Sequence, residues 1–539
     1  MLNRLRSFTV TVAVRVLTFV GRHPVTVLVL PSLWFLWQYL PFWKDIDATV
    51  QLVAPAYDDN ILHFPPVYCF LARVPFFLTD LLLTGHAPQI FAGQNPSLTA
   101  VYSLVAIQHL LLWIALGYFI KSIPATALGR GVAAFLLASI ASFYTFAHTC
   151  GSEAMTAVTY FFVFGAGMRM LRDRASCWTW VVYAVALFVS IGSRHINLVL
   201  LLWLPATAGL SLVWVWARGR RNKRVEAAES GPVVAAPNSE CRRPEPIAAG
   251  SQWLRSRALT ALTALVLSFL AFGTERAVVQ LLCARFAVVN RLSIGPSLSD
   301  RIASWVDPLA PPQKQMLLER TEKSTTDPLV KLAIRSQIET GAYYKGTDTA
   351  LEAALREKGF SGEALNVEKD RLTFQSALCF YRTGDPRFIK QVLIDFWRGF
   401  VPANDQGIAI AAPKATYFSL ERITANPSDW TGISSLPIFT PAQAKGTADR
   451  AYNDNMIRHW RWVPILIWIL VFLAIGIWRV RYRQLSGPMF ATGLSMLGVG
   501  ILIYAANCAC DSALPRYALP LLVSVIAFVA VTVTANEPE

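Results

Sequence analysis

The hydrophobic positions of this chain fall into long, nearly uninterrupted stretches instead of the narrow periodic faces of soluble helices. Ten of these stretches have about 17 to 24 residues and few charges, which is the length that crosses a bilayer as one α-helix. They cover residues 24–43, 97–120, 131–148, 154–171, 177–193, 196–217, 257–278, 462–478, 487–506 and 515–534. The pattern predicts an all-α polytopic membrane protein with about ten transmembrane helices.

One large polar region separates the seventh stretch from the eighth. In the first two thirds of residues 286–460, apolar residues recur at spacings of three and four, which predicts helices. These helices are expected over residues 311–323, 328–340, 349–358, 367–382 and 386–401. The last third is interrupted by prolines and is expected to be irregular. The region therefore predicts a mainly helical extracytoplasmic domain inserted between spans seven and eight.

The rest of the chain divides around this insertion. Residues 1–285 are predicted to form an N-terminal membrane domain, and residues 461–539 the C-terminal membrane helices. Within the first part, residues 218–256 are rich in Arg, Glu, Pro and Ala, which is typical of a mobile linker without a core. Residues 1–23 have the pattern of a basic amphipathic helix on the inner membrane face.

Composition supports the membrane assignment and excludes several classes. The 539 residues are 54% apolar and only 15% charged, whereas soluble domains average about 45–50% apolar and about 25% charged. This excludes disordered, collagenous and disulfide-rich secreted chains as well as ordinary soluble enzymes. A basic net charge of +15 would suit nucleic acid, but its distribution gives a different explanation.

The basic residues are concentrated in alternate loops. Residues 286–460 hold 21 basic and 19 acidic residues and are nearly neutral. Of the 28 other basic residues, 21 lie in five segments that face the cytoplasm if the N-terminus is inside. This is the positive-inside bias of membrane proteins. It predicts an integral protein of the bacterial inner (plasma) membrane with both termini in the cytoplasm, and no nucleic-acid partner.

Ionisable residues near the bilayer gather on the predicted outer side, where they are candidates for function. They come from three outer loops and from the start of the last span: Asp45, Asp47, His63, Glu153, Arg194, Arg516 and Tyr517. Carboxylates can act as a general base or hold a divalent cation, and guanidinium groups suit a phosphate or pyrophosphate. Both signs at the membrane edge suit a substrate that is part lipid and part anionic headgroup. Lys44, Asp59 and Arg73 fit better as helix caps or interfacial anchors.

Four features of the sequence together resemble the GT-C superfamily of polyprenyl-phosphate-sugar glycosyltransferases. This superfamily includes protein O-mannosyltransferases and the lipid A aminoarabinose transferase. The four features are the Asp45-Ile46-Asp47 motif after the first span, the Pro-Pro-Val-Tyr segment before the re-entrant-looking residues 66–85, Glu153, and Arg516-Tyr517 with a proline three residues later. The resemblance covers the membrane portion and leaves residues 286–460 unmatched. Many relatives have a lysine directly before Pro-Pro, where this chain has Phe64.

The resemblance implies an inverting transfer of a sugar from a polyprenyl-phosphate donor to an acceptor hydroxyl at the outer face. Asp45 is implied as the base, with Asp47 as the second choice, while Glu153 orients the acceptor or shares a divalent cation (Mg²⁺, Mn²⁺ or Ca²⁺) with Asp45. Since the lysine is absent, Arg194, Arg516, His63 and Tyr517 are the candidates for the donor phosphate. The acceptor would be an envelope lipid, a glycan or a protein.

Three other classes fit parts of the pattern. An O-antigen polymerase or ligase also has many spans and a large outer loop with arginines, but it does not require acids directly after span one. A transporter or lipid-linked-sugar flippase would line a pathway with Asp45, Glu153 and Arg194, yet such proteins usually have internal repeats and broken helices near the bilayer midplane. The third class is an inactive scaffold with a partner-binding outer domain.

Overall fold

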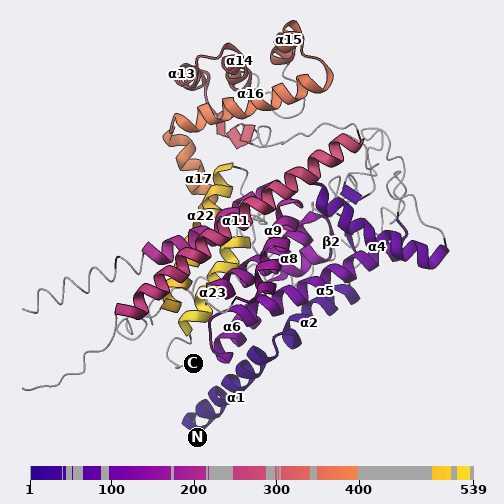
Figure 1. The fold of residues 1–539 in the computed structure, drawn as a ribbon, viewed down its shortest axis with the longest axis vertical. Coiled ribbons are helices and arrows are strands. Elements are labelled where there is room, and N and C mark those ends of the chain that lie inside the picture. Colours follow the sequence, from indigo (N-terminus) through magenta and orange to yellow (C-terminus); the bar gives the residue numbers. More distant parts are fainter. Residues whose placement is uncertain are drawn as a thin grey trace, which may run out of the picture.

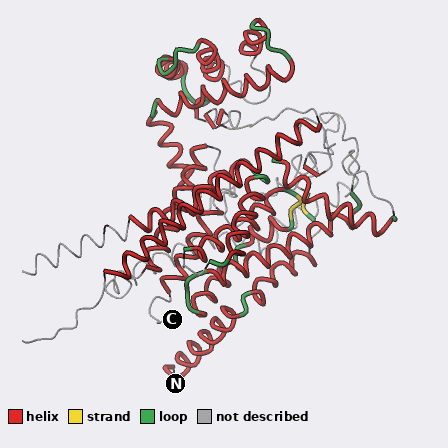
Figure 2. Tube along the Cα trace, in the orientation of Figure 1, coloured by secondary structure: helices red, strands yellow, loops and turns green. Residues whose placement is uncertain are grey.

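The computed structural model describes just under two thirds of the chain in detail. The described residues are 2–38, 41–43, 51–52, 65–85, 96–171, 175–213, 217, 247–286, 298–299, 301–302, 305–339, 349–398, 488–510 and 519–533. Within them the chain is helical, except for loops and one pair of two-residue strands (Figures 1 and 2). The all-helical class predicted from the sequence is therefore confirmed for this part of the chain.

Several described helices are long and apolar enough to cross a membrane. They are α4 (Pro66–Thr84), α5 (Leu98–Ser122), α11 (Ile247–Phe286) and α22 (Pro488–Cys510). α1 (Leu2–Arg22) and α2 (Val25–Gln38) meet at 81°, and they make a fifth span if they count as one broken helix. The chain is thus a helical membrane protein with four or five candidate spans among the described residues. The count of ten and the position of the inserted domain stay predictions, and the expected span 462–478 lies outside the described residues.

Two apolar stretches fold differently from the sequence-based expectation. Residues 66–85, which look re-entrant in the sequence, form the continuous helix α4 with Pro75 inside it. The stretch 131–148, expected as one span, is divided between α6 (Ala127–Ala138) and α7 (Ala141–Ala147). Hydropathy records apolar length but not the local break, and here the break falls at Ser139 and Ile140, between the two helices. The helix α11 begins at Ile247, inside the segment 218–256 that the sequence predicts to be a linker.

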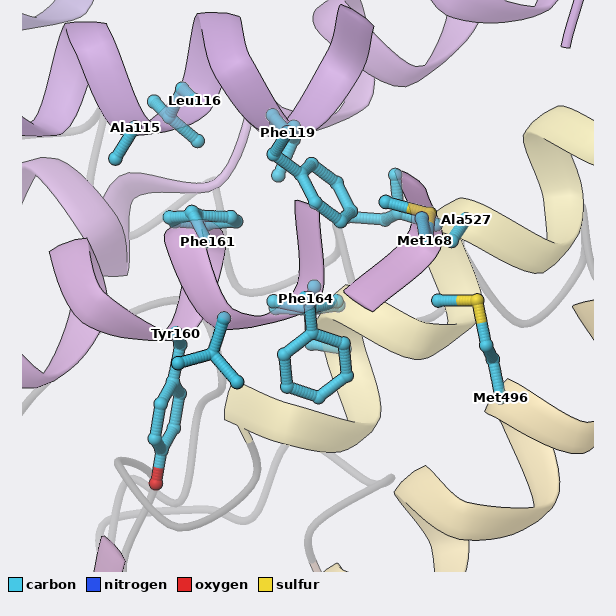
Figure 3. Packing of buried hydrophobic residues seen from close by; sticks show 14 of the residues in the cluster. Ala115, Leu116, Phe119, Tyr160, Phe161, Phe164, Met168, Met496 and Ala527 are labelled. Carbon is cyan, nitrogen blue, oxygen red and sulfur yellow. The ribbon is translucent and has the colours of Figure 1, made fainter. Parts of the chain in front are cut away.

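The main core lies between the central helices α5, α8 (Ser152–Met170), α22 and α23 (Leu519–Val533). Phe119 of α5 and Phe161 of α8 pack with ring centroids 5.4 Å apart. The ring centroids of Phe164 and Trp203 lie 4.3 Å apart. Figure 3 shows these phenylalanines in the same buried cluster as Met496 and Ala527 of the two C-terminal helices, with Ala527 next to Met168 of α8. The C-terminal helices therefore complete a core that the N-terminal half begins.

Small residues allow α1 to cross α6 at very short range. A Cβ added at Gly131 would lie 1.9 Å from the carbonyl oxygen of Leu17, and one at Gly21 would lie 1.7 Å from the carbonyl oxygen of Ala127. The two backbones approach closely because glycine has no side chain at either crossing point, as in other packed membrane helices. The predicted helix at residues 1–23 is thus present, while its place on the inner membrane face stays a prediction.

A second group of helices lies at one end of the molecule, away from the start of α1 (Figure 1). It consists of α13 (Pro311–Glu322), α14 (Pro328–Glu339), α15 (Thr349–Glu357) and α16 (Gly362–Arg382), with its own core. α17 (Pro386–Arg398) follows this group in the chain and packs against α22. Four of these five helices begin at the residue that the sequence predicts, while α16 begins five residues earlier, at Gly362 instead of residue 367.

Contacts with the C-terminal half of α22 attach both α16 and α17 to the membrane helices. The Tyr381 hydroxyl donates a hydrogen bond of 2.6 Å to the carbonyl of Ala509, and the rings of Phe396 and Tyr504 lie 5.2 Å apart. The amphipathic helix α17 therefore turns Phe396 toward a membrane helix.

Candidate functional site

A short pair of strands joins the end of the first predicted span to the second predicted outer loop, which lies between residues 148 and 154. β1 (Phe42–Trp43) follows α2 and pairs in parallel with β2 (Thr149–Cys150), which precedes α8. In this register Trp43 lies opposite Cys150. The contact joins residues more than 100 positions apart in the chain, and it places the end of the α2 segment beside the N-terminus of α8.

The first turn of α8 receives its cap from a distant part of the chain. The N-cap residue Gly151 has no side chain, whereas the first N–H groups of a helix need acceptors. The side-chain oxygen of Gln51 accepts the Ser152 N–H at 3.2 Å, and Gln51 Nε2 donates to Ser152 Oγ at 3.4 Å. Gln51 is buried, so this amide replaces the missing local cap.

Two of the residues predicted for the site form an ion pair at this helix end. Arg194 Nη1 contacts Glu153 Oε1 directly and also donates to Ser152 Oγ at 3.3 Å. The Glu153 side chain is 4% exposed and that of Arg194 is 14% exposed. A carboxylate in the first turn of a helix also gains from the positive end of the helix dipole. The structure thus brings the second and third predicted outer loops to one point.

A second arginine contacts Gln51, the residue that caps α8. Arg73 of α4 is 1% exposed, and its guanidinium donates to the backbone carbonyl of Gln51 from Nη2 at 3.1 Å and from Nε at 3.4 Å. The sequence analysis assigned Arg73 to a cap or anchor role and did not single out Gln51. The available signal was an arginine inside the apolar residues 66–85, which is costly there unless it has partners.

Polar side chains of α4 and α5 form hydrogen bonds around the β2 strand. Gln108 Nε2 donates to the carbonyls of Ala147 (2.9 Å) and Thr149 (3.0 Å), while the Tyr68 hydroxyl donates to Gln108 Oε1 at 3.2 Å. The adjacent His109 contacts His148 through Nε2 at 3.2 Å. These buried contacts fix the turn that leads into α8.

The other predicted site residues lie outside the described part of the chain: Asp45, Asp47, His63, Arg516 and Tyr517. Asp45 and Asp47 lie between Trp43 and Gln51 in the sequence, and both of these flanking residues contact the β2–α8 junction. Among the described residues, no three His, Cys, Asp or Glu side chains come together as a metal site. The shared cation at Asp45 and Glu153 therefore stays a prediction.

The described geometry is that of a helical membrane protein with a buried, charged cluster at one helix end. The sequence matches no family model and no curated protein. Among solved structures, the chain is similar to the archaeal oligosaccharyltransferase AglB from Archaeoglobus fulgidus in complex with an inhibitory peptide and a dolichol-phosphate. The TM-score is 0.37 and the identity 11%, over 98% of this chain and 50% of that one. The chain thus spans half the length of that protein.

Proposed function

We infer that this protein is a membrane glycosyltransferase of the GT-C type. It would transfer a sugar from a polyprenyl-phosphate donor to an acceptor hydroxyl at the outer face of the membrane. One observation carries the proposal: a buried Glu153–Arg194 pair lies at the junction contacted by Trp43 and Gln51. These residues flank the Asp45-Ile46-Asp47 motif in the sequence.

In the proposed reaction, the acceptor oxygen forms a bond to the anomeric carbon while the bond from that carbon to the phosphate oxygen breaks. Asp45 takes the proton of the acceptor hydroxyl, which is otherwise a weak nucleophile. The polyprenyl phosphate leaves with the bonding electrons, and attack from the opposite face inverts the anomeric carbon. Asp47 is the alternative base.

The charges of the pair suit the two ends of this reaction. A guanidinium has five N–H donors, so the contact of Arg194 with Glu153 is compatible with a second contact to a phosphate. A fixed cation at that place stabilises the charge that develops on the leaving group. Arg516, His63 and Tyr517 are proposed to complete the phosphate contacts, and Glu153 is proposed to hold Arg194 and orient the acceptor.

Deletion of the gene tests the proposal, with glycans on envelope lipids, polysaccharides and proteins measured by mass spectrometry. We expect one acceptor class to lose a sugar and the wild-type gene to restore it. Asp45→Asn should not restore it, and Glu153→Gln should restore it only in part. Unchanged glycans after deletion, or full restoration by Asp45→Asn at normal protein level, would reject the proposal.

The chain offers a matched control for the glutamate. Glu275 of α11 is also a buried carboxylate beside an arginine, with Arg276 Nε 2.6 Å from its Oε2. Glu275→Gln makes the same chemical change on a different helix and should restore the glycan fully. The same assay with EDTA tests whether transfer needs a divalent cation. Loss of transfer that added Mg²⁺ or Mn²⁺ reverses would support a cation at Asp45 and Glu153. Unchanged transfer would leave Arg194 as the counter-charge of Glu153.

A further inference from the structure

We propose that Arg73 is a positioning residue for the Glu153–Arg194 pair and that it acts through Gln51. The proposal starts from the burial of the guanidinium, which is 1% exposed in the apolar helix α4. A buried charge is costly unless hydrogen bonds compensate it. Two N–H groups of Arg73 are directed to one acceptor, the carbonyl of Gln51.

Gln51 connects this arginine to the helix that carries Glu153. Its backbone carbonyl is held by Arg73, and its side-chain amide makes two hydrogen bonds with Ser152, one to the N–H and one to the hydroxyl. Ser152 Oγ also accepts from Arg194. A continuous series of polar contacts therefore runs from α4 through Gln51 and Ser152 to the ion pair.

The local sequence of α8 makes this connection necessary. Since Gly151 offers no side-chain acceptor, the first turn depends on Gln51 for its cap. A cap from a distant segment costs less conformational entropy when the backbone of that segment is already held, and the Arg73 contact holds the backbone of Gln51. In this role Arg73 sets the position of Gln51 and, through it, of the first turn of α8.

Hydrogen–deuterium exchange of the full chain in lipid nanodiscs tests the structural part without any substrate. In Arg73→Met, amides in peptides covering residues 150–156 should exchange about tenfold faster, because the turn loses support equivalent to about one buried hydrogen bond. Arg73→Lys keeps a charged donor and should give an intermediate rate. It also carries the test if Arg73→Met does not accumulate.

Asp80→Asn is the matched control, because Asp80 is also buried on α4 but accepts from Ser97 Oγ (2.5 Å) at the start of α5. This variant should change exchange near Ser97 and leave residues 150–156 unchanged. The proposal is overturned if Arg73→Met leaves residues 150–156 unaffected. It is also overturned if exchange rises equally near residues 150–156 and near Ser97, because that result indicates general loss of stability.

The effect on activity rests on the proposed function and is measured in the glycan restoration assay. Arg73→Met should restore the glycan no better than Glu153→Gln, with Arg73→Lys better than Arg73→Met and Asp80→Asn equal to wild type. If exchange changes as expected but deletion alters no glycan, the proposed function fails and the positioning role stands. If Asp45 proves essential while Arg73→Met is normal in both assays, the positioning role fails and the function stands.

Discussion

The Glu153–Arg194 pair allows a quantitative test of how strongly this junction is shielded from solvent. Its side chains are 4% and 14% exposed, so removal of one partner leaves a charge that water reaches poorly. Loss of one member of a buried pair typically costs about 3–5 kcal/mol, whereas an exposed pair contributes about 0–1 kcal/mol. Since Glu153 is the more buried partner, Arg194→Met should be the more harmful single change, at about 3 kcal/mol or more.

Removal of both charges should be much less harmful than removal of the arginine alone. Replacing a buried pair by uncharged groups is often close to neutral, because the desolvation cost of both ions disappears with their attraction. We therefore expect Glu153→Gln combined with Arg194→Met to be at least about 2 kcal/mol more stable than Arg194→Met, which is a strong coupling for neighbouring residues. Reversible unfolding in mixed SDS micelles, followed by circular dichroism, measures all four proteins of the cycle.

The pair formed by Arg335 and Glu322 is a matched control. Its nitrogen and oxygen atoms are 2.9 Å apart, but its side chains are 53% and 20% exposed. The same substitutions there should show a coupling below about 1 kcal/mol, as expected of a solvated pair. If Arg194→Met is no more harmful than Arg335→Met, or if the two cycles give equal coupling, the inference of a shielded charge pair at α8 is refuted.

Two further predictions concern packing and pH. Gly167→Ala should lower the free energy of unfolding by about 1–3 kcal/mol, and with it the melting temperature of the purified protein, because an added Cβ would lie 1.9 Å from Cζ3 of Trp203. Gly209→Ala has open space at its Cβ and should leave the melting temperature unchanged. Equal melting temperatures for the two variants would contradict this packing. Asp385 accepts the Arg387 N–H at the start of α17, and the Arg387 side chain lowers the pKa of that carboxyl below its ordinary value of 3.8. Asp385→Asn should therefore lower the free energy of unfolding at pH 6, as measured by urea unfolding. The difference between this variant and wild type should shrink as the pH falls below about 4, because the wild-type carboxylate is then protonated. A difference that stays constant down to pH 3 would contradict the ion pair.

The sequence by itself determined the elements whose causes are local. Apolar length made α5 and α11 recognisable as membrane helices, and Pro311, Pro328 and Pro386 marked helix starts because proline fits the first turn. The same local information placed charged residues in the predicted outer loops. It could not show which of them meet, since hydropathy and helix signals carry no information on distant pairs.

Only the tertiary structure decided how the candidate site is assembled. The pairing of Trp43 with Cys150 and the cap that Gln51 provides to Ser152 both join residues about 100 positions apart. Arg73 has the sequence signature of an interfacial anchor, and its burial against Gln51 follows from the packing of α4 beside the junction. Because Gly151 leaves α8 without a local cap, the fold supplies one from a distant segment, and no local pattern in the sequence specifies which segment it is.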